Sequence, residues 1–366
     1  MKGKRKVIIV ISIIVCLAVV CGGFLIFTKH QMSKIPEMTF EETLEYTTSG
    51  KSDAVITVGI IKDGEVSYKV YGENGKELEN ELHTYEIGSL TKTVTAGLVN
   101  KAVLEGKISL NSTIDEYLTL PEGNTYPTIA ELLTHTSGYK SHYMEKPMVE
   151  NFFKGRNDFY GVDKEMTINR LSKLSTDKEN YKFKYSNFGF ATLGLVLESV
   201  YDTDYVTLCN DFLQNELGLK NTKISQKDGD LGKYWDWSET DAYLSAGAVT
   251  SDILDMLKYA QLQLEENNVF SDCHDSLKKT NATTQTYKAM GICMDEIGMS
   301  WIIDNENDII WHNGGTSNYN SYLGFNPETK TAVVVLSNCS PMYKIPATVM
   351  GAKLLCEVQN GDSTDF

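Results

Sequence analysis

Apolar and polar positions alternate in short segments towards both ends of the chain, a pattern typical of strands with one buried face. Residues 54–61 predict a strand, Asp63-Gly64 a hairpin turn and residues 66–71 the partner strand. In the last third, strands are expected at 299–303, 308–311, 321–325 and 331–336, with turns at Asn305-Glu306 and Asn326-Pro327.

Elsewhere apolar residues recur every three or four positions, the spacing of an amphipathic helix. A helix is predicted over 89–105, ending before Gly106, and residues 111–257 are predicted to be mostly helical. Thr128 and Glu131 form a capping box that opens a helix through Leu133. Further helices are expected at 40–46, 187–200, 205–217 and 345–356, and one capped by Thr250 or Ser251 holds Leu254, Leu257 and Ala260.

This order of elements is a hairpin, a long helical insertion, a run of strands and a last helix. It predicts an α+β fold in which an antiparallel sheet is flanked by helices and carries a mostly helical inserted subdomain. The chain has 366 residues, which suits one such domain with a large core. We place this domain at 39–359, after a tether at 29–38 and before a tail at 360–366.

The N-terminal segment contains 21 residues without a charge, 7–27, close to the roughly 20 that span a bilayer core. Four basic residues precede this run and predict that residues 1–28 form a cytoplasmic basic tip and a transmembrane helix. The rest of the chain would then be extracellular, held at the cell membrane by a single span. A cleaved signal peptide is the alternative, and it would leave the body secreted.

The net charge of −15 argues against a nucleic-acid partner. Five of the seven cysteines lie outside the apolar run, an odd number for an exported body, and a Cys273–Cys293 bridge is left open. The chain has no GxSxG, HExxH, CxxC, GxxxxGK[ST] or GxGxxG motif, and its six histidines are scattered. We therefore expect neither a metal nor a cofactor.

Four Ser-x-x-Lys pairs occur, and the pair Ser89/Lys92 differs from the other three in its context. Ser89 opens a predicted helix, where free N–H groups and the helix dipole favour developing negative charge. Lys92 lies one turn later on the same side. A serine hydroxyl needs a neighbouring base, and burial can lower the pKa of a lysine enough to serve as one.

Two further segments carry candidate chemistry. Tyr185-Ser-Asn187 is the only Tyr-x-Asn among twenty tyrosines, and a loop tyrosine followed by an N-cap asparagine is the alternative. The segment His312-Asn313-Gly314-Gly315 follows the strand ending at Trp311, and its alternative is a glycine-containing hairpin turn.

These three motifs, in this order, resemble the serine β-lactamases and penicillin-binding proteins, which carry Ser-x-x-Lys, Tyr-x-Asn and a Lys-Thr-Gly-like triplet on a strand. The phrase 84–89 is similar to the family's approach to its nucleophile, and 132–138 is similar to a phrase of the class C-like branch. Leu244-Ser-Ala-Gly247 and the segment 332–338 also match. The resemblance runs from about residue 40 to 358 and implies the β-lactamase/transpeptidase-like fold.

The resemblance also implies roles for individual residues. Ser89 would attack a carbonyl to form an acyl-enzyme, Lys92 would help to remove its proton, and Tyr185 would be the partner base. Asn187 would orient the substrate amide, and the N–H groups of Ser89 and Gly315 would form the oxyanion hole. His135, which belongs to the phrase 132–138, is expected to brace its loop.

One departure concerns the third motif, which in the family usually begins with Lys and has Thr or Ser next. The resemblance implies that His312, Asn313, Gly314 and Gly315 bind the substrate or form the oxyanion hole. His312 and Asn313 take the first two positions of the motif, and a largely neutral histidine would grip a substrate carboxylate more weakly. β-Lactam hydrolysis thereby becomes a weaker hypothesis.

The function expected from the sequence is an exported serine hydrolase acting on an amide or ester, with a D-amino-acid or cell-wall peptide as one candidate substrate. A carboxylesterase or β-lactamase of the same fold is one alternative. A sensor or binding module that is acylated without turnover is another. Trp235 and Trp237 are candidates for stacking on a surface polymer, against ordinary packing as the alternative.

Overall fold

The computed structural model describes residues 33–176, 181–224, 229–265 and 268–361. The predicted anchor at 7–27, with Cys16 and Cys21 in it, and the tail residues 362–366 lie outside these ranges. Within the described ranges, no helix is both long and apolar enough to cross a membrane.

The larger sheet is antiparallel throughout and has eight strands in the described part of the chain. In spatial order these are β2 (Glu65–Tyr71), β1 (Ile56–Lys62), β11 (Thr331–Ser337), β10 (Asn320–Asn326), β9 (Ile309–Gly315), β8 (Ile302–Asp304), β7 (Glu296–Ile297) and β6 (Lys278–Lys279). The N-terminal hairpin therefore joins the C-terminal strands through the pairing of β1 with β11. Every residue of β10 and β11 is buried, because helices cover both faces of the sheet.

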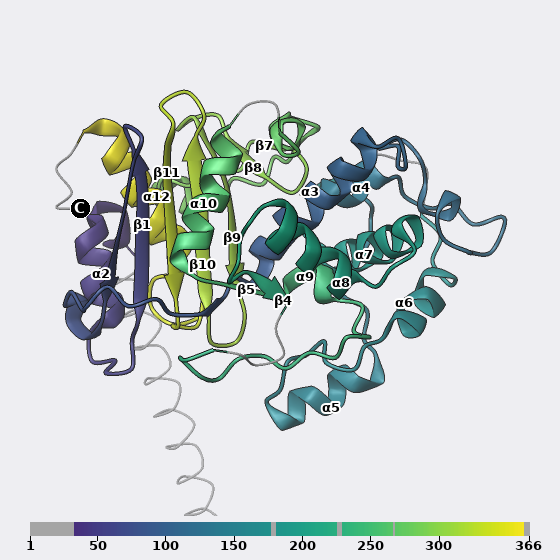
Figure 1. Ribbon diagram of the computed structural model, residues 1–366, viewed down its shortest axis with the longest axis horizontal. Helices are drawn as coiled ribbons and strands as arrows, with labels where there is room; N and C mark the ends of the chain where they lie inside the picture. Colours follow the sequence, from purple (N-terminus) through teal and green to yellow (C-terminus); the bar gives the residue numbers. More distant parts are fainter. Residues whose placement is uncertain (1–32, 177–180, 225–228, 266–267, 362–366) are drawn as a thin grey trace, which may run out of the picture.

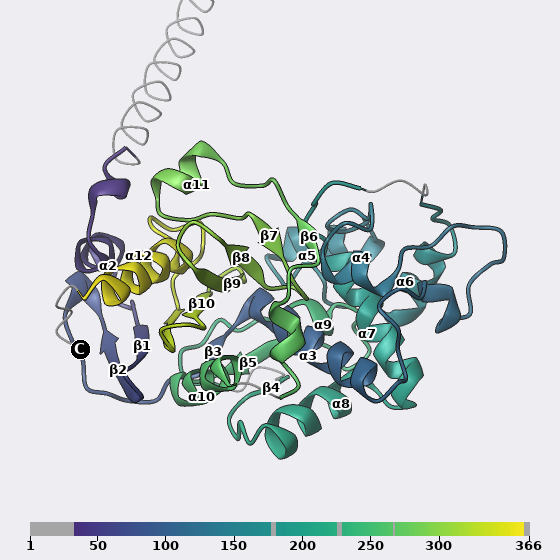
Figure 2. The ribbon, with the colours of Figure 1, turned by 90° about the horizontal axis from the view of Figure 1, so that it is seen from above.

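Figure 2 shows α2 (Phe40–Thr48) and α12 (Ala347–Asn360) on one face of the sheet and α10 (Ile253–Leu264) and α3 (Thr91–Leu104) on the other. Two apolar cores follow from this layering. One lies between the sheet and α2 with α12, and the other joins the opposite face to the helices of the insertion. The predicted α+β architecture is confirmed.

The helical region lies beside the sheet in Figure 1. Its helices are α4 (Ile129–Leu133), α5 (Lys146–Lys154), α6 (Lys164–Leu171), α7 (Asn187–Tyr201), α8 (Tyr205–Asp211) and α9 (Leu244–Gly247). Helix α11 (Gln285–Ala289) lies between β6 and β7 in the sequence. A small second sheet, in the order β3 (Tyr85–Glu86), β5 (Val249–Ser251) and β4 (Lys223–Ile224), links this region to the residues that precede α3.

Three local predictions need correction. Thr250 and Ser251 do not cap α10, because both lie in β5, and Asp252 accepts the N–H of Asp255 instead. The N-cap of α7 is Ser186, whose hydroxyl accepts the N–H of Gly189, so Asn187 is the first helical residue. The helix predicted over 205–217 changes after Asp211 into a π-helical segment, Phe212–Glu216.

The strand predicted to end at Trp311 continues through Gly315. Its last four residues pair with β10, with Gly315 opposite Asn320 and His312 opposite Leu323. The hairpin-turn alternative for this segment is therefore wrong. The five cysteines in the described ranges are all free, which also removes the Cys273–Cys293 bridge.

Candidate active site

Ser89 lies in a tight turn where the chain passes from β3 into α3. Gly88 has φ +52°, and residues Gly88–Leu90 form one 3₁₀ turn before the α-helix starts at Thr91. The α-helix therefore begins two residues later than predicted, and Ser89 lies just ahead of it. Its side chain is half-buried, which leaves the hydroxyl reachable from solvent.

Lys92 is completely buried directly beneath this serine. Its Nζ lies 3.0 Å from Ser89 Oγ and donates a second hydrogen bond of 2.6 Å to the carbonyl of Ala246 in α9. Burial lowers the pKa of Lys92 well below its ordinary value, which favours the neutral amine. By contrast, Lys140 and Lys279, which end two of the other Ser-x-x-Lys pairs, are exposed.

Tyr185 completes a triangle with these two residues. Its phenol hydrogen-bonds to Ser89, and the centre of its ring lies 4.9 Å from Lys92 Nζ. Burial raises the pKa of Tyr185 further than this hydrogen bond lowers it, so the phenol holds its proton. Of the two groups beside Ser89, the amine of Lys92 is therefore better suited to accept a proton.

His135 holds the Tyr185 segment in place, as expected from the sequence. The rings of His135 and Tyr185 lie 4.5 Å apart, and His135 Nδ1 accepts the N–H of Ser186 at 3.1 Å. The carbonyl of His135 also accepts the N–H of Lys184. Burial, then the charges of Lys92 and His312, lower the pKa of His135 well below its ordinary value, so it acts as a neutral acceptor.

Strand β9 forms the opposite side of the site, and its alternation sorts the predicted residues into two groups. His312 is buried on the side of Lys92, where burial, and then the charge of Lys92, lower its pKa to about 3. Its Nδ1 lies 2.7 Å from the carbonyl of Asn313 and donates to it. The Asn313 amide points to the other side of the sheet, where it donates to Thr348 Oγ1 of α12 at 2.8 Å.

Gly314 of β9 and Gly88 allow this strand to contact the turn that carries Ser89. A Cβ on Gly314 would lie 1.9 Å from the carbonyl oxygen of Ile87, and one on Gly88 would lie 2.5 Å from the nitrogen of Gly315. Any larger residue at Gly314 would push β9 away from Ser89. The structure therefore brings Ser89, Lys92, Tyr185, His312, Gly314 and Gly315 together, with the half-buried Asn187 two residues beyond Tyr185.

Glu86 is a residue at this site whose role was not predicted from the sequence. Its buried carboxylate accepts hydrogen bonds from the N–H of Trp235 and the hydroxyl of Thr316, so it joins the loop before α9 to the turn after β9. Burial raises the pKa of Glu86 to about 7, against the lowering effect of these two bonds. Its place three residues before Ser89, in the phrase already quoted, is the only sequence signal that marks it.

The two tryptophans proposed as stacking residues differ in exposure. Trp237 is buried in the core, whereas Trp235 is half-buried and donates from Nε1 to Ser317 Oγ at 3.0 Å. Trp237 therefore takes the packing alternative, and Trp235 lies at the edge of the site.

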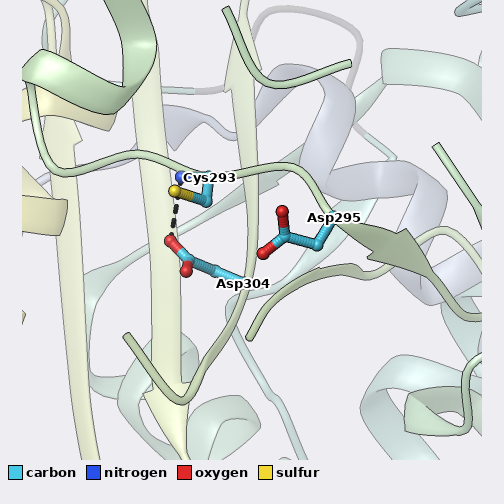
Figure 3. Close-up of side chains that lie close together, drawn as sticks. All are labelled: Cys293, Asp295 and Asp304. Carbon is cyan, nitrogen blue, oxygen red and sulfur yellow. Dashed lines mark hydrogen bonds between the residues drawn. The ribbon is translucent and has the colours of Figure 1, made fainter. Parts of the chain in front are cut away.

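One group in the described residues has the composition of a metal site. Cys293, Asp295 and Asp304 offer ligand atoms within 4.8 Å of one another (Figure 3). Asp304, however, already accepts the N–H groups of Cys293, Glu306 and Asn307 and the side-chain amide of Asn307. These bonds hold the hairpin between β8 and β9, so the carboxylate has a structural function without an ion.

The fold and the residues gathered around Ser89 agree with one family of proteins. The family model described as "Beta-lactamase" matches residues 49–348, and the chain belongs to this family.

Known proteins similar to the chain share limited sequence identity with it. Protein flp of Staphylococcus aureus (strain MW2) is 24% identical over 313 residues, which cover 78% of this chain and only 59% of that relative. The β-lactamase/D-alanine carboxypeptidase of Yersinia pestis, solved with citrate, has a TM-score of 0.70 at 19% identity, covering 90% of this chain and 98% of the other. The octameric penicillin-binding protein homologue of Pyrococcus abyssi has a TM-score of 0.68 at 23% identity and covers 94% and 78%. At these identities the two structures establish the fold alone.

Proposed function

We propose that this protein cleaves a neutral ester or amide through an acyl-enzyme on Ser89. The observation that carries the proposal is the contact of 3.0 Å between Ser89 Oγ and the Nζ of a fully buried lysine. A buried amine with a lowered pKa beside a reachable hydroxyl is the arrangement that nucleophilic catalysis needs.

In the acylation step, Ser89 Oγ bonds to the substrate carbonyl carbon while its proton passes to Lys92 Nζ. The bond from that carbon to the alcohol or amine then breaks, and the leaving group takes a proton through the phenol of Tyr185. We assign the proton-accepting role to Lys92 and a relay role to Tyr185, because burial lowers the pKa of the first and raises that of the second.

In the second step a water oxygen bonds to the acyl carbon and gives a proton to the same pair. The bond from that carbon to Ser89 Oγ then breaks, Oγ takes a proton back from the pair, and the acid is released. Negative charge forms on the carbonyl oxygen in both steps. The backbone N–H groups of Ser89 and Gly315 are the donors that we propose for it, since β9 contacts the turn before Ser89. Asn187, two residues after Tyr185, is proposed to orient the substrate.

The substrate class follows from the charge state of the site. With a pKa of about 3, His312 is neutral near pH 7 and offers no ion pair to a carboxylate. This supports a neutral ester or amide over an anionic β-lactam. A D-amino-acid or cell-wall peptide remains a candidate amide where no free carboxylate adjoins the cleaved bond.

We also propose that the body is exported and held at the cell membrane by residues 7–27, on the basis of their apolar sequence and the basic residues before them. Protease added to intact cells should then digest the body. Protection of the body until the cells are lysed would contradict this placement.

The direct test is turnover of p-nitrophenyl acetate by the purified full-length chain beside its Ser89→Ala variant. Wild type should release p-nitrophenol catalytically, and Ser89→Ala should lose activity by about 10⁴-fold or more. Equal activity in the two proteins would rule out Ser89 as nucleophile.

Intact mass with benzylpenicillin separates the alternatives. A persistent adduct on wild type alone would favour the acylated sensor or a penicillin-binding peptidase. Consumption of the drug without an adduct would favour a β-lactamase. An unmodified protein with unconsumed drug would favour the esterase or peptidase expected from His312.

A further inference from the structure

The helical side of the molecule contains an apolar pocket of about 460 Å³, a size typical of small-molecule sites. Helix α5, at the edge of the helical region in Figure 1, provides half of its lining. The lining residues are His142, Met144, Met148, Val149, Phe152, Phe153, Asp158 and Phe159. Phe152 and Phe153 are 75% and 83% exposed, so a large apolar surface here has no partner within the described residues.

A first chain of contacts connects this pocket to the catalytic lysine. Phe159 stacks on Tyr243 with ring centres 4.3 Å apart and an angle of 17°. Tyr243 is the N-cap of α9, and Ala246 in the same short helix accepts the hydrogen bond from Lys92 Nζ. Phe159 in the wall of the pocket is therefore connected, through Tyr243 and α9, to the Ala246 carbonyl that orients Lys92.

A second chain of contacts connects the pocket to Asn187. The loop that carries His142 is bonded to the start of α7, because the carbonyl of Ser141 accepts the N–H of Phe188 at 2.9 Å. The carbonyl of Lys140 accepts the hydroxyl of Ser186 at 2.7 Å. The pocket thus opens beside the segment that presents Tyr185 and Asn187.

Trp235 provides the third connection. Its indole donates to Ser317, two residues after Gly315, and its ring centre lies 6.3 Å from that of Phe159. An apolar surface therefore extends from the end of β9, across Trp235 and Phe159, to the residues of α5.

We propose that this pocket binds a hydrocarbon group of the ester or amide that is cleaved at Ser89. The inference rests on the proposed function and adds the substrate class, namely a substrate with a medium-length alkyl chain or a comparable apolar group. The neutral catalytic centre and the apolar pocket share one wall. An apolar substrate fits this arrangement better than a charged substrate does. Each methylene group buried there should raise affinity by roughly fourfold.

The experiment compares two p-nitrophenyl esters, the acetate and the octanoate, on the full-length chain. Wild type should show a kcat/KM for the octanoate at least about tenfold above that for the acetate. Val149→Asp places a charge in the pocket at a position that is 45% exposed, and it should lower the octanoate value about tenfold or more while the acetate value stays within about twofold.

Val66→Asp on β2 is the matched control, since Val66 is 43% exposed and does not line the pocket. It should leave both esters unchanged. Phe152→Ser is a second pocket variant, chosen because its exposed side chain contributes little to folding, and it should reduce the octanoate preference in the same way. Hexyl acetate, with the alkyl chain on the alcohol side, tells which part of the substrate the pocket holds.

Two results would overturn the inference while leaving the proposed function intact. One is Ser89-dependent turnover of all esters with no preference for chain length. The other is an unchanged preference for the octanoate in both pocket variants. Absence of Ser89-dependent turnover of any ester would overturn the proposed function and the role of the pocket with it.

Discussion

The sheet wall of the site, residues 312–315 of β9, is packed far more tightly than the helical wall, which comprises Tyr185–Asn187, the loop 138–145 and α5. On the sheet wall, backbone touches backbone, and a single methyl group on Gly314 would overlap the carbonyl of Ile87. On the helical wall, half-buried and exposed side chains border a pocket. The first wall contacts the turn that carries Ser89, and the second borders the pocket that we propose for the substrate.

The largest effect that tests this contrast is expected from adding one methyl group to each wall. Gly314→Ala places a Cβ 1.9 Å from Ile87 O and 2.5 Å from Ser321 Oγ, so β9 must shift. We expect a loss of about 3 kcal/mol in unfolding free energy and an activity too low to measure against Ser89→Ala. Urea unfolding and p-nitrophenyl acetate turnover are the measurements.

Gly189→Ala is the counterpart on the helical side, in α7 two residues after Asn187. Its nearest neighbours would be Ser186 Oγ at 3.3 Å and Leu132 at 3.4 Å, and the residue lies in α7, where alanine is favoured over glycine. The change in unfolding free energy should stay within about 1 kcal/mol. Equal losses in the two variants would contradict the difference in packing between the walls.

A pH-dependent effect, comparable in size to that of Gly314→Ala, is expected from Glu86, which joins the sheet wall to the loop of Trp235. Burial raises the pKa of Glu86 from 4.5 to about 7. The folded state therefore holds this proton more tightly than the unfolded chain, and the resulting stabilisation is complete below pH 4.5 and is lost as the pH rises through about 7. The loss over that window corresponds to about 3 kcal/mol.

Glu86→Gln keeps the size of the side chain and an acceptor but removes the titration. Comparing urea midpoints of wild type and Glu86→Gln at pH 5, 6, 7 and 8 isolates this group from all other titrations. The difference between the two proteins should shift in favour of the variant as the pH rises. Parallel curves would show that Glu86 does not ionise on unfolding in this range.

The contrast between the walls also explains how much the sequence could predict. Alternation and turn residues located the central strands, because these signals are local. The Ser-x-x-Lys spacing occurs four times, and the helix that follows Ser89 distinguished the pair Ser89/Lys92 from the other three. The short strands β3, β4 and β5 were missed, since two or three residues acquire strand geometry only through distant partners. The end of β9 was also missed, because residues 312–315 are polar or glycine and take strand geometry through their pairing with β10.

The pocket on the helical wall had no signal in the sequence. Phe152 and Phe153 are adjacent in α5, and only tertiary placement decides that both remain exposed beside Phe159. Similarly, the resemblance to the family assigned Asn313 to substrate binding, but the direction of its side chain depends on the register of β9 against β10. One residue of strand changes the face to which a side chain points.

Asn313 supplies the smallest predicted effect and the sharpest test of this register. Its amide donates to Thr348 Oγ1 on the side of the sheet away from Lys92, so Asn313→Ala should cost about 1 kcal/mol of stability. The kcat/KM for p-nitrophenyl acetate should stay within about twofold of wild type, whereas a substrate-binding amide would cost about tenfold. Thr348→Val removes the same hydrogen bond from the other partner and has no route to the substrate. The two substitutions should therefore be non-additive in stability. If Asn313→Ala lowered kcat/KM and Thr348→Val did not, the Asn313 side chain would have to face Ser89 instead of α12.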